Sequence, residues 1–306
     1  MKRSILIGPS SFGETSRKPI EILEKKGFHV IKNPYGRKIK KKELIKLLSK
    51  NVVGLIAGLE NLDNEVLSKS SLKIISRVGS GTSNIDLQSL KKNKIILFSI
   101  PDGPVASVSE LTVANIINLF RNIVPMNKDL QNGKWKRQIG NELKGKNILI
   151  IGYGRIGRKV ASLLEPFEVN IMVYDPYLSI KLKKKYKMVS LNQGLKKADL
   201  ITIHSSGNKC ILGKDEFKTM KNGMLLCNAA RGELISERDL IHALKSGVVT
   251  AGWLDTFEEE PYDGKLTKFK QLILTPHIGS YTRECRTSME EKAVNNLIRS
   301  LNLNAN

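Results

Sequence analysis

The sequence predicts an α/β protein of two domains, each a doubly wound parallel sheet with helices on both faces. Short apolar runs alternate with helical patterns along the chain, which is typical of parallel sheets. The length of 306 residues is enough for two hydrophobic cores. Residues 144–175 place a strand, a glycine-rich turn, a helix, a second strand and an acid in that order. This order indicates a dinucleotide-binding unit.

The first hundred residues predict the smaller of the two domains. The expected strands are residues 4–8, 28–32, 52–57, 73–78 and 94–99, and the expected helices are residues 19–26, 41–48, 64–68 and 87–92. No glycine triplet follows a strand in this half. We therefore expect it to carry something other than the dinucleotide unit.

Two loops in this half follow predicted strands and are rich in glycine and small polar residues. They are residues 8–13 (GPSSFG) and residues 77–86 (RVGSGTSNID). Ligands of open α/β sheets lie beyond the carboxyl ends of the strands, where such loops can offer backbone N–H groups to an anion. An ordinary strand-to-helix turn is the alternative for each loop.

The middle of the chain predicts one long helix over residues 104–128, followed by a loop over residues 131–145. The apolar spacing continues through the whole helical segment. No strand interrupts it before the dinucleotide unit begins. We expect this helix to cross from one domain to the other.

The turn of the dinucleotide unit carries Gly152, Gly154 and Gly157 in the spacing G-x-G-x-x-G. The first glycine allows a tight turn, the second a close approach of a pyrophosphate, and the third close packing of helix on strand. Asp175 ends the next strand, where its carboxylate can accept hydrogen bonds from a ribose and would repel a 2′-phosphate. NAD is therefore the expected cofactor. Lys181 and residues 183–185, all lysines, leave NADP open.

The remainder of the chain continues the alternation. The expected strands are residues 200–204, 224–228, 249–255 and 272–274, and a final helix over residues 283–303 is expected to return to the first domain. Polar or small residues follow each strand, on one edge of the sheet. We expect residues 1–99 with 281–306 to form one domain and residues 100–280 the dinucleotide-binding domain.

Three features after these strands suggest chemistry. His277 can exchange a proton near neutral pH, the acidic residues of DTFEEEP (255–261) can hold such a histidine, and Arg231 can bind a carboxylate. Each alone also suits a structural role: a capping histidine, a solvated acidic loop or a surface arginine. His29 and His242 lie within predicted elements and are expected to be structural.

Composition limits the other classes of function. The formal net charge is +22, but the lysines are dispersed without interleaved aromatic residues, which disfavours nucleic acid and favours a small anionic substrate. No apolar stretch is long enough to span a membrane. Three cysteines without paired spacing predict neither disulfides nor a metal site and indicate a cytoplasmic protein.

Several motifs in register resemble one known family. GYGRIG with Asp175, then NAARGEL, DTFEEEP and TPHIGS, and before them RVGSGTSNID and PDGPVASVSELT, are similar to the D-2-hydroxyacid dehydrogenase superfamily. The most similar branch is the phosphoglycerate dehydrogenase-like one. The resemblance implies a Rossmann NAD-binding domain, a discontinuous flavodoxin-like substrate domain and a homodimer formed through the NAD-binding domain.

The resemblance also implies a role for individual residues. Arg231, Glu260 and His277 would be catalytic, with Glu260 as the partner of the acid/base His277. Residues implied in substrate binding are Arg77, Ser80 and Gly81. Those implied in cofactor binding are Gly152, Gly154, Arg155, Ile156, Gly157, Asp175, His204, Ser205, Ala229, Ala230, Asp255, Gly279 and Ser280.

The implied activity is hydride transfer between NAD and the C2 atom of a D-2-hydroxy acid or 2-keto acid. The substrate stays open among 3-phosphoglycerate, glyoxylate, hydroxypyruvate and other 2-keto acids. A formate dehydrogenase-like enzyme and an NAD-sensing protein of the corepressor type are the alternatives. In one departure from the family, no proline closely follows His204, where the chain reads Ser205-Ser206-Gly207-Asn208.

Overall fold

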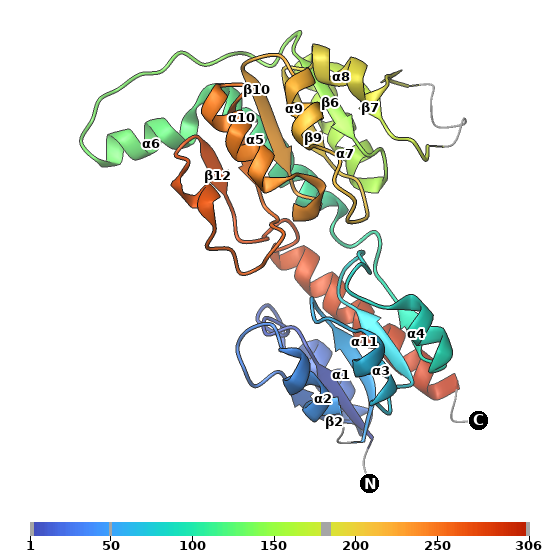
Figure 1. Ribbon diagram of the computed structural model, residues 1–306. Helices are drawn as coiled ribbons and strands as arrows, with labels where there is room; N and C mark the ends of the chain where they lie inside the picture. Colours follow the sequence, from blue (N-terminus) through green and yellow to red (C-terminus); the bar gives the residue numbers. More distant parts are fainter. Residues whose placement is uncertain (1–2, 49–50, 179–184, 304–306) are drawn as a thin grey trace. The chain divides into compact units, whose positions relative to one another are not determined.

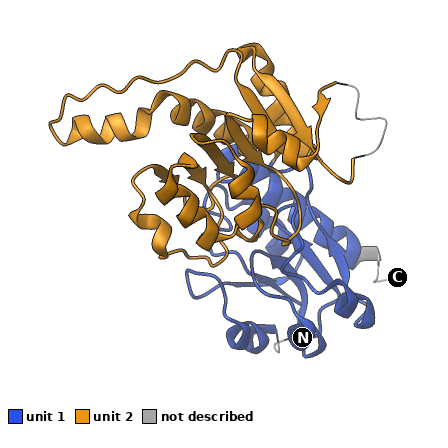
Figure 2. Cartoon of the chain, turned by 45° about the horizontal axis from the view of Figure 1, so that its top comes forward, with its two compact units in different colours: residues 1–104, 280–306 blue, residues 105–279 orange. Residues whose placement is uncertain are grey.

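The computed structural model describes residues 3–48, 51–178 and 185–303. The chain divides into two compact units, residues 1–104 with 280–306 (unit 1) and residues 105–279 (unit 2), coloured separately in Figure 2. The expected boundaries lay at 99/100 and 280/281. The terminal helix therefore joins unit 1 although all of unit 2 precedes it in the chain.

Unit 1 is built on a parallel sheet, with five strands among its described residues, in the order β2-β1-β3-β4-β5. Its strands are β1 (Ser4–Ile7), β2 (His29–Lys32), β3 (Val52–Ala57), β4 (Ile74–Arg77) and β5 (Ile96–Phe98). Its helices are α1 (Lys18–Lys25), α2 (Lys41–Leu48), α3 (Asn64–Ser68), α4 (Leu87–Lys92) and α11 (Arg283–Leu303), shown in Figure 1.

Alternation along β1 divides the core of unit 1 into two layers. Ile5 and Ile7 pack in one cluster with residues of α1 and α11, whereas Leu6 packs in the other with residues of α2, α3 and α4. Successive side chains of a strand point to opposite faces, so each face needs its own helices. α11 contributes side chains at intervals of four to the first cluster, including Met289, Ala293 and Leu297, each at most 1% exposed.

Unit 2 contains a larger parallel sheet, seven-stranded over its described residues, in the order β12-β11-β10-β9-β6-β7-β8. The strands are β6 (Asn147–Ile151), β7 (Asn170–Tyr174), β8 (Lys187–Met188), β9 (Leu200–Ile203), β10 (Met224–Asn228), β11 (Val249–Leu254) and β12 (Leu272–Leu274). The helices are α5 (Val105–Arg121), α6 (Ile123–Gln131), α7 (Arg155–Leu164), α8 (Leu191–Lys197), α9 (Lys214–Thr219) and α10 (Glu237–Ser246). Short 3₁₀ turns are η1 (Glu165–Phe167), η3 (Gly232–Leu234) and η4 (Lys265–Lys268).

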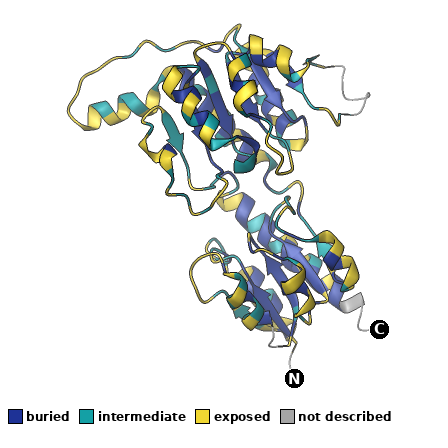
Figure 3. Cartoon of the chain, viewed as in Figure 1, coloured by how far each residue is buried: buried dark blue, intermediate teal, exposed yellow. Residues whose placement is uncertain are grey.

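The central strands of unit 2 are buried on both faces, as Figure 3 shows. Ile148 and Ile150 of β6 pack with residues of α5 and α7, whereas Leu149 and Ile151 pack on the opposite face with residues of α8, α9 and α10. A strand covered on both faces reads as a continuous apolar run. The predicted fold class, two doubly wound parallel-sheet domains, is confirmed.

The single long helix expected over residues 104–128 is wrong, because the segment forms two helices. α5 ends at Arg121, Asn122 has φ of 52° in the left-handed region, and α6 begins at Ile123. Pro125 explains the break: inside a continuous helix its ring would clash with the carbonyl group of Arg121. In α6 the same proline lies in the first turn, where it is tolerated.

α6 and the segment after it extend away from the rest of unit 2 (Figure 1). α6 has no buried residue.

β8 is another difference from the expected strands, because two residues are too short to produce an alternating pattern. In the described part of the chain, no helix is long and apolar enough to cross a membrane.

Candidate active site

The order of the larger sheet brings the predicted site residues of unit 2 to one edge. β6 pairs with β7 on one side and with β9 on the other, so the chain order reverses between β6 and β9. Ligands of doubly wound sheets bind at this reversal, beyond the carboxyl ends of the strands. The turns after β6, β7, β9, β10, β11 and β12 carry the predicted residues in that region.

Gly152 lies where the chain order reverses, in a turn packed directly against another stretch of backbone. Its φ is +90°, and an added Cβ would lie 2.6 Å from the nitrogen of Ser205 and 2.7 Å from the carbonyl carbon of His204. Only glycine fits such a turn against a second backbone. The loops after β6 and β9 are thereby in direct contact.

Gly154 and Gly157 meet different requirements. A Cβ at Gly157 would lie 2.1 Å from the carbonyl oxygen of Gly152, whereas a Cβ at Gly154 would meet no atom within 4 Å. Gly154 is the N-cap of α7 and provides no side-chain cap to the first turn. Open space before uncapped helical N–H groups suits a pyrophosphate, so these residues fit the dinucleotide. Arg155 and Ile156 open the helix behind them.

Asp175 holds the same turn from the end of β7. Its Oδ2 accepts a hydrogen bond from the Tyr153 N–H at 2.8 Å, and its Oδ1 accepts one from the Tyr177 N–H at 2.9 Å. An ionised carboxylate has about four acceptor positions, so capacity for a ribose remains. Lys181, Lys183 and Lys184, which left NADP open, lie outside the described residues, and Lys185 pairs with Glu165 at 2.7 Å.

His204 ends the strand next to β6. Its Nε2 lies 2.9 Å from the hydroxyl of Thr202, and its Nδ1 is shielded from solvent without a hydrogen-bond partner. Burial lowers the pKa of His204 to about 3. The ring is therefore neutral at physiological pH. His204 and Ser205 contact the glycine turn through their backbone.

Arg231 is presented by a turn that Asn228 fixes. The buried Asn228 side chain donates to the Arg231 carbonyl at 2.8 Å and accepts from the Ala230 N–H at 3.0 Å. Ala229 and Ala230 form the half-buried turn itself. The Arg231 guanidinium donates to the Ala230 carbonyl at 2.6 Å. Asn228, the last residue of β10, thus fixes the position of the Arg231 backbone.

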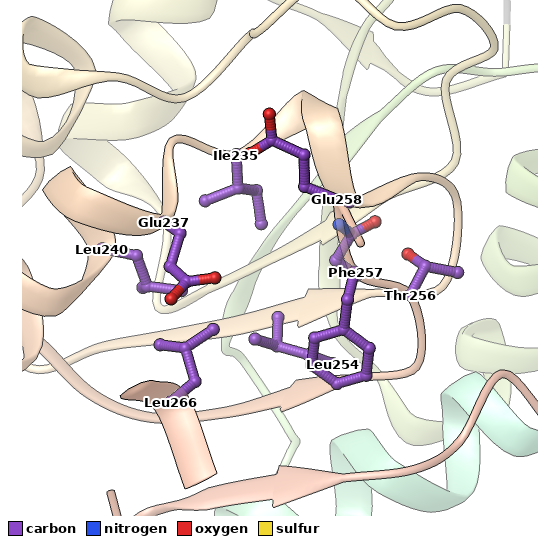
Figure 4. Close-up of a pocket in the computed structure, with 10 residues that line it drawn as sticks. Ile235, Glu237, Leu240, Leu254, Thr256, Phe257, Glu258 and Leu266 are labelled. Carbon is purple, nitrogen blue, oxygen red and sulfur yellow. The ribbon is translucent and has the colours of Figure 1, made fainter. Parts of the chain in front are cut away.

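Gly232 joins this turn to the acidic segment. An added Cβ would lie 2.0 Å from the carbonyl carbon of Phe257 and 2.1 Å from the nitrogen of Glu258. Behind the contact lies a small pocket, with Thr256, Phe257 and Glu258 on one side and Ile235 and Leu240 on the other (Figure 4). Its lining includes none of Arg231, Glu260 and His277, so we regard the pocket as part of the scaffold.

His277 and Glu260 are in direct contact. His277 Nδ1 lies 2.8 Å from Glu260 Oε2, and the other carboxylate oxygen accepts from the Phe257 N–H at 3.1 Å. Burial, the largest influence, would raise the pKa of Glu260, but the hydrogen bond and charge of His277 and the charge of Arg231 lower it overall. Glu260 is therefore a carboxylate at neutral pH, and the neighbouring histidine and arginine both act on it.

Asp255 braces the turn that carries His277. Its carboxylate accepts from the Thr275 hydroxyl at 2.6 Å and from the N–H groups of Ile278 and Gly279 at 2.8 and 2.7 Å. Trp253 donates to the same Thr275 hydroxyl at 2.9 Å. His277 itself has φ of 54°, a conformation that costs energy in a non-glycine residue. These bonds hold the strained turn in place.

The remaining predicted residues lie in unit 1. Arg77 is 5% exposed and donates to the carbonyl groups of Gly81, Val78 and Ala57 at 3.1, 2.8 and 3.4 Å. The structure thus uses this side chain to shape the loop after β4. Ser80 is exposed and Gly81 is half-buried in that loop, and Ser280 lies beyond the boundary of unit 2.

Sequence reasoning missed the supporting residues Asn228, Gly232, Trp253 and Thr275. Asn228 and Thr275 follow apolar runs at strand ends, which is the only signal that could have identified them. The contacts of Gly232 and Trp253 depend on tertiary packing. Among the residues that the structure describes, no group of three or more His, Cys, Asp or Glu is arranged to hold a metal ion.

Comparisons with known proteins place the chain in one family. Residues 113–279 match the family described as D-isomer specific 2-hydroxyacid dehydrogenase, NAD binding domain. The D-3-phosphoglycerate dehydrogenase of Archaeoglobus fulgidus is 33% identical over 285 residues, which cover 90% of this chain and 53% of that protein. This chain therefore spans about half the length of that relative.

Two further relatives match most of both chains. The glyoxylate reductase of Thermococcus litoralis is 34% identical over 257 residues, covering 78% of this chain and 77% of that protein. The NAD⁺-bound 3-phosphoglycerate dehydrogenase structure from Entamoeba histolytica has a TM-score of 0.80 and 26% identity, covering 97% of this chain and 94% of that one. Because the family model that matches residues 113–279 is that of an NAD-binding domain, NAD is the cofactor of this domain.

The glycine turn gives a matched pair of substitutions. Gly157→Ala should lower the melting temperature, because its Cβ would meet the backbone of Gly152 and such overpacking costs about 1–3 kcal/mol. Gly154→Ala should leave the melting temperature nearly unchanged and weaken NADH binding, because it fills open space at the helix N-terminus. Thermal melts and NADH fluorescence titrations measure both effects. Equal behaviour of the two variants would contradict this division of roles.

His204 makes stability depend on pH. Its pKa is about 3 in the folded protein and near 6.5 in the unfolded chain. Below pH 6.5 the unfolded chain therefore binds a proton that the folded protein does not, and the free energy of unfolding decreases as the pH is lowered. The expected slope is at most about 1.4 kcal/mol per pH unit. Urea unfolding followed by tryptophan fluorescence reports on this unit, since Trp135 and Trp253 both lie in it.

His204→Gln is the comparison for that slope. The amide keeps a polar group near Thr202 and has no titratable nitrogen, so the loss of stability between about pH 6.5 and 5 should be smaller than in the original protein. The same slope in both proteins would show that His204 is not its cause.

Proposed function

The chain belongs to the D-isomer specific 2-hydroxyacid dehydrogenase family, and we propose that it interconverts a D-2-hydroxy acid and the corresponding 2-keto acid. The observation that carries this proposal is the 2.8 Å contact of His277 with Glu260 beside the charge of Arg231. A base, its carboxylate partner and a carboxylate-binding cation are the groups that oxidation of a hydroxy acid requires. Formate oxidation removes no hydroxyl proton and has less need of the acid.

The cofactor would be held by the glycine turn and by Asp175. Backbone N–H groups at the start of α7 would face the pyrophosphate, and the free acceptor positions of Asp175 would bind the adenosine ribose. When bound, NAD supplies a nicotinamide ring that accepts or donates a hydride. The turns after β9, β10, β11 and β12 would line the nicotinamide side, with Asp255 acting there mainly through the backbone that it braces.

His277 would exchange the proton at the substrate oxygen. Its Nδ1 is engaged by Glu260, so Nε2 is the nitrogen left for the substrate. In oxidation this nitrogen would take the hydroxyl proton, and in reduction it would return a proton to the new alkoxide. Glu260 fixes the orientation of the ring through this contact.

Arg231 would bind the substrate carboxylate. Its planar guanidinium can donate two parallel hydrogen bonds to two carboxylate oxygens, which fixes the position of the C2 atom. Asn228 and Gly232 position the arginine relative to Glu260 through the contacts described above. Arg77, Ser80 and Gly81 would shape or line the substrate side of unit 1.

We also propose a homodimer formed through the arm, defined here as α6 with residues 132–140. Within this arm Trp135 is 82% exposed and Ile139 is 97% exposed. A nine-residue helix without buried side chains is marginal in water, and a second copy of the same arm would bury these residues symmetrically.

A cytoplasmic location is supported by the three cysteines, which are all free thiols.

Substitutions in the catalytic group test the proposed reaction. His277→Gln should lower kcat by about 100-fold or more and leave NADH affinity nearly unchanged. Arg231→Gln should mainly raise KM, because it removes ground-state binding of the carboxylate. Glu260→Gln should lower kcat less than His277→Gln and change the pH profile. The assay is NADH oxidation with glyoxylate, hydroxypyruvate, pyruvate and 2-oxoglutarate.

The exposed His242 supplies the control, since His242→Gln should retain full activity. If His277→Gln kept most of the activity, the assignment would be wrong. Complete absence of turnover in a protein that binds NADH would favour an NAD-sensing role instead.

The arm predicts a change of oligomeric state. Light scattering during size-exclusion chromatography should give a dimer for the original chain and a monomer for the double variant Trp135→Glu, Ile139→Glu, because each charge would be buried at the interface. Tyr177→Glu is the control, since Tyr177 is 95% exposed outside the arm. A dimeric double variant, or a monomeric original chain, would refute the proposed interface.

A further inference from the structure

The sheet of unit 1 has its own point where the chain order reverses. In the order β2-β1-β3-β4-β5, β1 pairs with β2 on one side and β3 on the other. In sheets of this order the ligand lies beyond the carboxyl ends of the first and third strands. Gly8 follows β1 and Gly58 follows β3, so these two residues mark the crevice.

The side chain of Glu60 occupies this crevice. Glu60 is 1% exposed, and its Oε2 accepts a hydrogen bond from the Gly58 N–H at 2.6 Å. A Cβ added to Gly8 would lie 2.3 Å from Oε1, and one added to Gly58 would lie 3.1 Å from the same oxygen. The carboxyl group is therefore packed directly on the backbone at both strand ends. It takes the place and the N–H donor that an external anion would use.

The neighbouring cation, Arg77, is also engaged in hydrogen bonds within unit 1. Arg77 ends β4, the strand beside β3, and donates to three backbone carbonyl groups around it. The charges of Arg77 and Lys38 act on Glu60. The arginine expected to meet the substrate is thus engaged in holding the loop after β4 and in compensating a buried acid.

The carboxyl group opposes a second anion in either protonation state. Burial raises the pKa of Glu60, against its backbone hydrogen bonds and the nearby cations. When ionised, the group repels an anion, because like charges at close range are strongly unfavourable. When protonated, it still fills the space and uses the Gly58 N–H.

We propose that Glu60 determines substrate specificity by closing this crevice to a phosphate group. The substrate would then be a 2-hydroxy or 2-keto acid with one carboxylate and an uncharged remainder. This inference rests on the function proposed above, and it separates this chain from relatives named for a phosphorylated acid.

Hydroxypyruvate and 3-phosphohydroxypyruvate test the inference, because they differ only in the phosphoryl group. The original protein should favour hydroxypyruvate in kcat/KM by roughly 100-fold, as expected for a like-charge contact. Glu60→Gln keeps the side-chain volume and removes the ionisable group, so the preference should narrow. Glu60→Ala also empties the crevice, so the preference should narrow further. Glu24→Gln, an exposed acid on α1, should leave the ratio unchanged.

Inorganic phosphate gives a second measurement that does not depend on turnover. In calorimetric titrations Glu60→Ala should bind phosphate more tightly than the original protein and than Glu24→Gln, because the Gly58 N–H becomes available. Thermal melts establish that each variant is folded. Where the alanine variant is unstable, the kcat/KM ratio of the isosteric Glu60→Gln decides instead, because its amide oxygen can still accept the Gly58 N–H.

The outcomes separate the two proposals. Preference of the original protein for phosphohydroxypyruvate, or an unchanged ratio in both Glu60 variants, would overturn the role of Glu60 and leave the proposed dehydrogenase function intact. If neither compound and no other keto acid reacts, the proposed function fails. The phosphate titration then decides about Glu60 alone, and equal phosphate affinity in the original protein and Glu60→Ala would refute its role.

Discussion

The parallel direction of the strands is the constraint on which both units depend. All described strands of one sheet end at the same edge, so each loop after a strand meets its neighbours there, although the loops are far apart in sequence. In unit 2 two such contacts are tight enough to require glycine: Gly152 against the backbone of His204 and Ser205, and Gly232 against the backbone of Phe257 and Glu258. The same principle brings Arg231 near Glu260 and places His277 beside it. The chemistry is thus assembled from strand ends and needs no dedicated domain.

Much of this arrangement was visible in the sequence, because strands buried on both faces give continuous apolar runs. The motif around Gly152 and the expected strands of unit 2 lie close to where the sequence placed them, whereas the two-residue strand β8 was not expected. The break at Asn122 was missed because the apolar periodicity continues across it, although Pro125 was the available signal. The bonds from Trp253 to Thr275 and from Thr275 to Asp255 are contacts between neighbouring strands, which a single sequence does not encode locally.

Buried acids fix the conformation of loops in both units. Asp255 accepts backbone N–H groups that fix a strained turn, and Glu60 does the same for the end of β3 while filling a crevice. Glu290, 0% exposed, pairs with Arg286 at 2.7 Å and accepts the Gly13 N–H. Burying such groups is unfavourable unless their hydrogen bonds are satisfied. Each acid therefore specifies one loop conformation more than it adds to stability.

The position of α11 has a consequence for how the protein is made. Its side chains at Met289, Ala293 and Leu297 complete one layer of the core of unit 1, but they follow the whole of unit 2 in the chain. During translation the ribosome therefore delivers every strand of both sheets before that layer can close. Until then, the apolar face of β1 with Ile5 and Ile7 lacks its longest helix. During this interval the apolar face of β1 is open to non-native contacts, whereas all residues of unit 2 have already been synthesised.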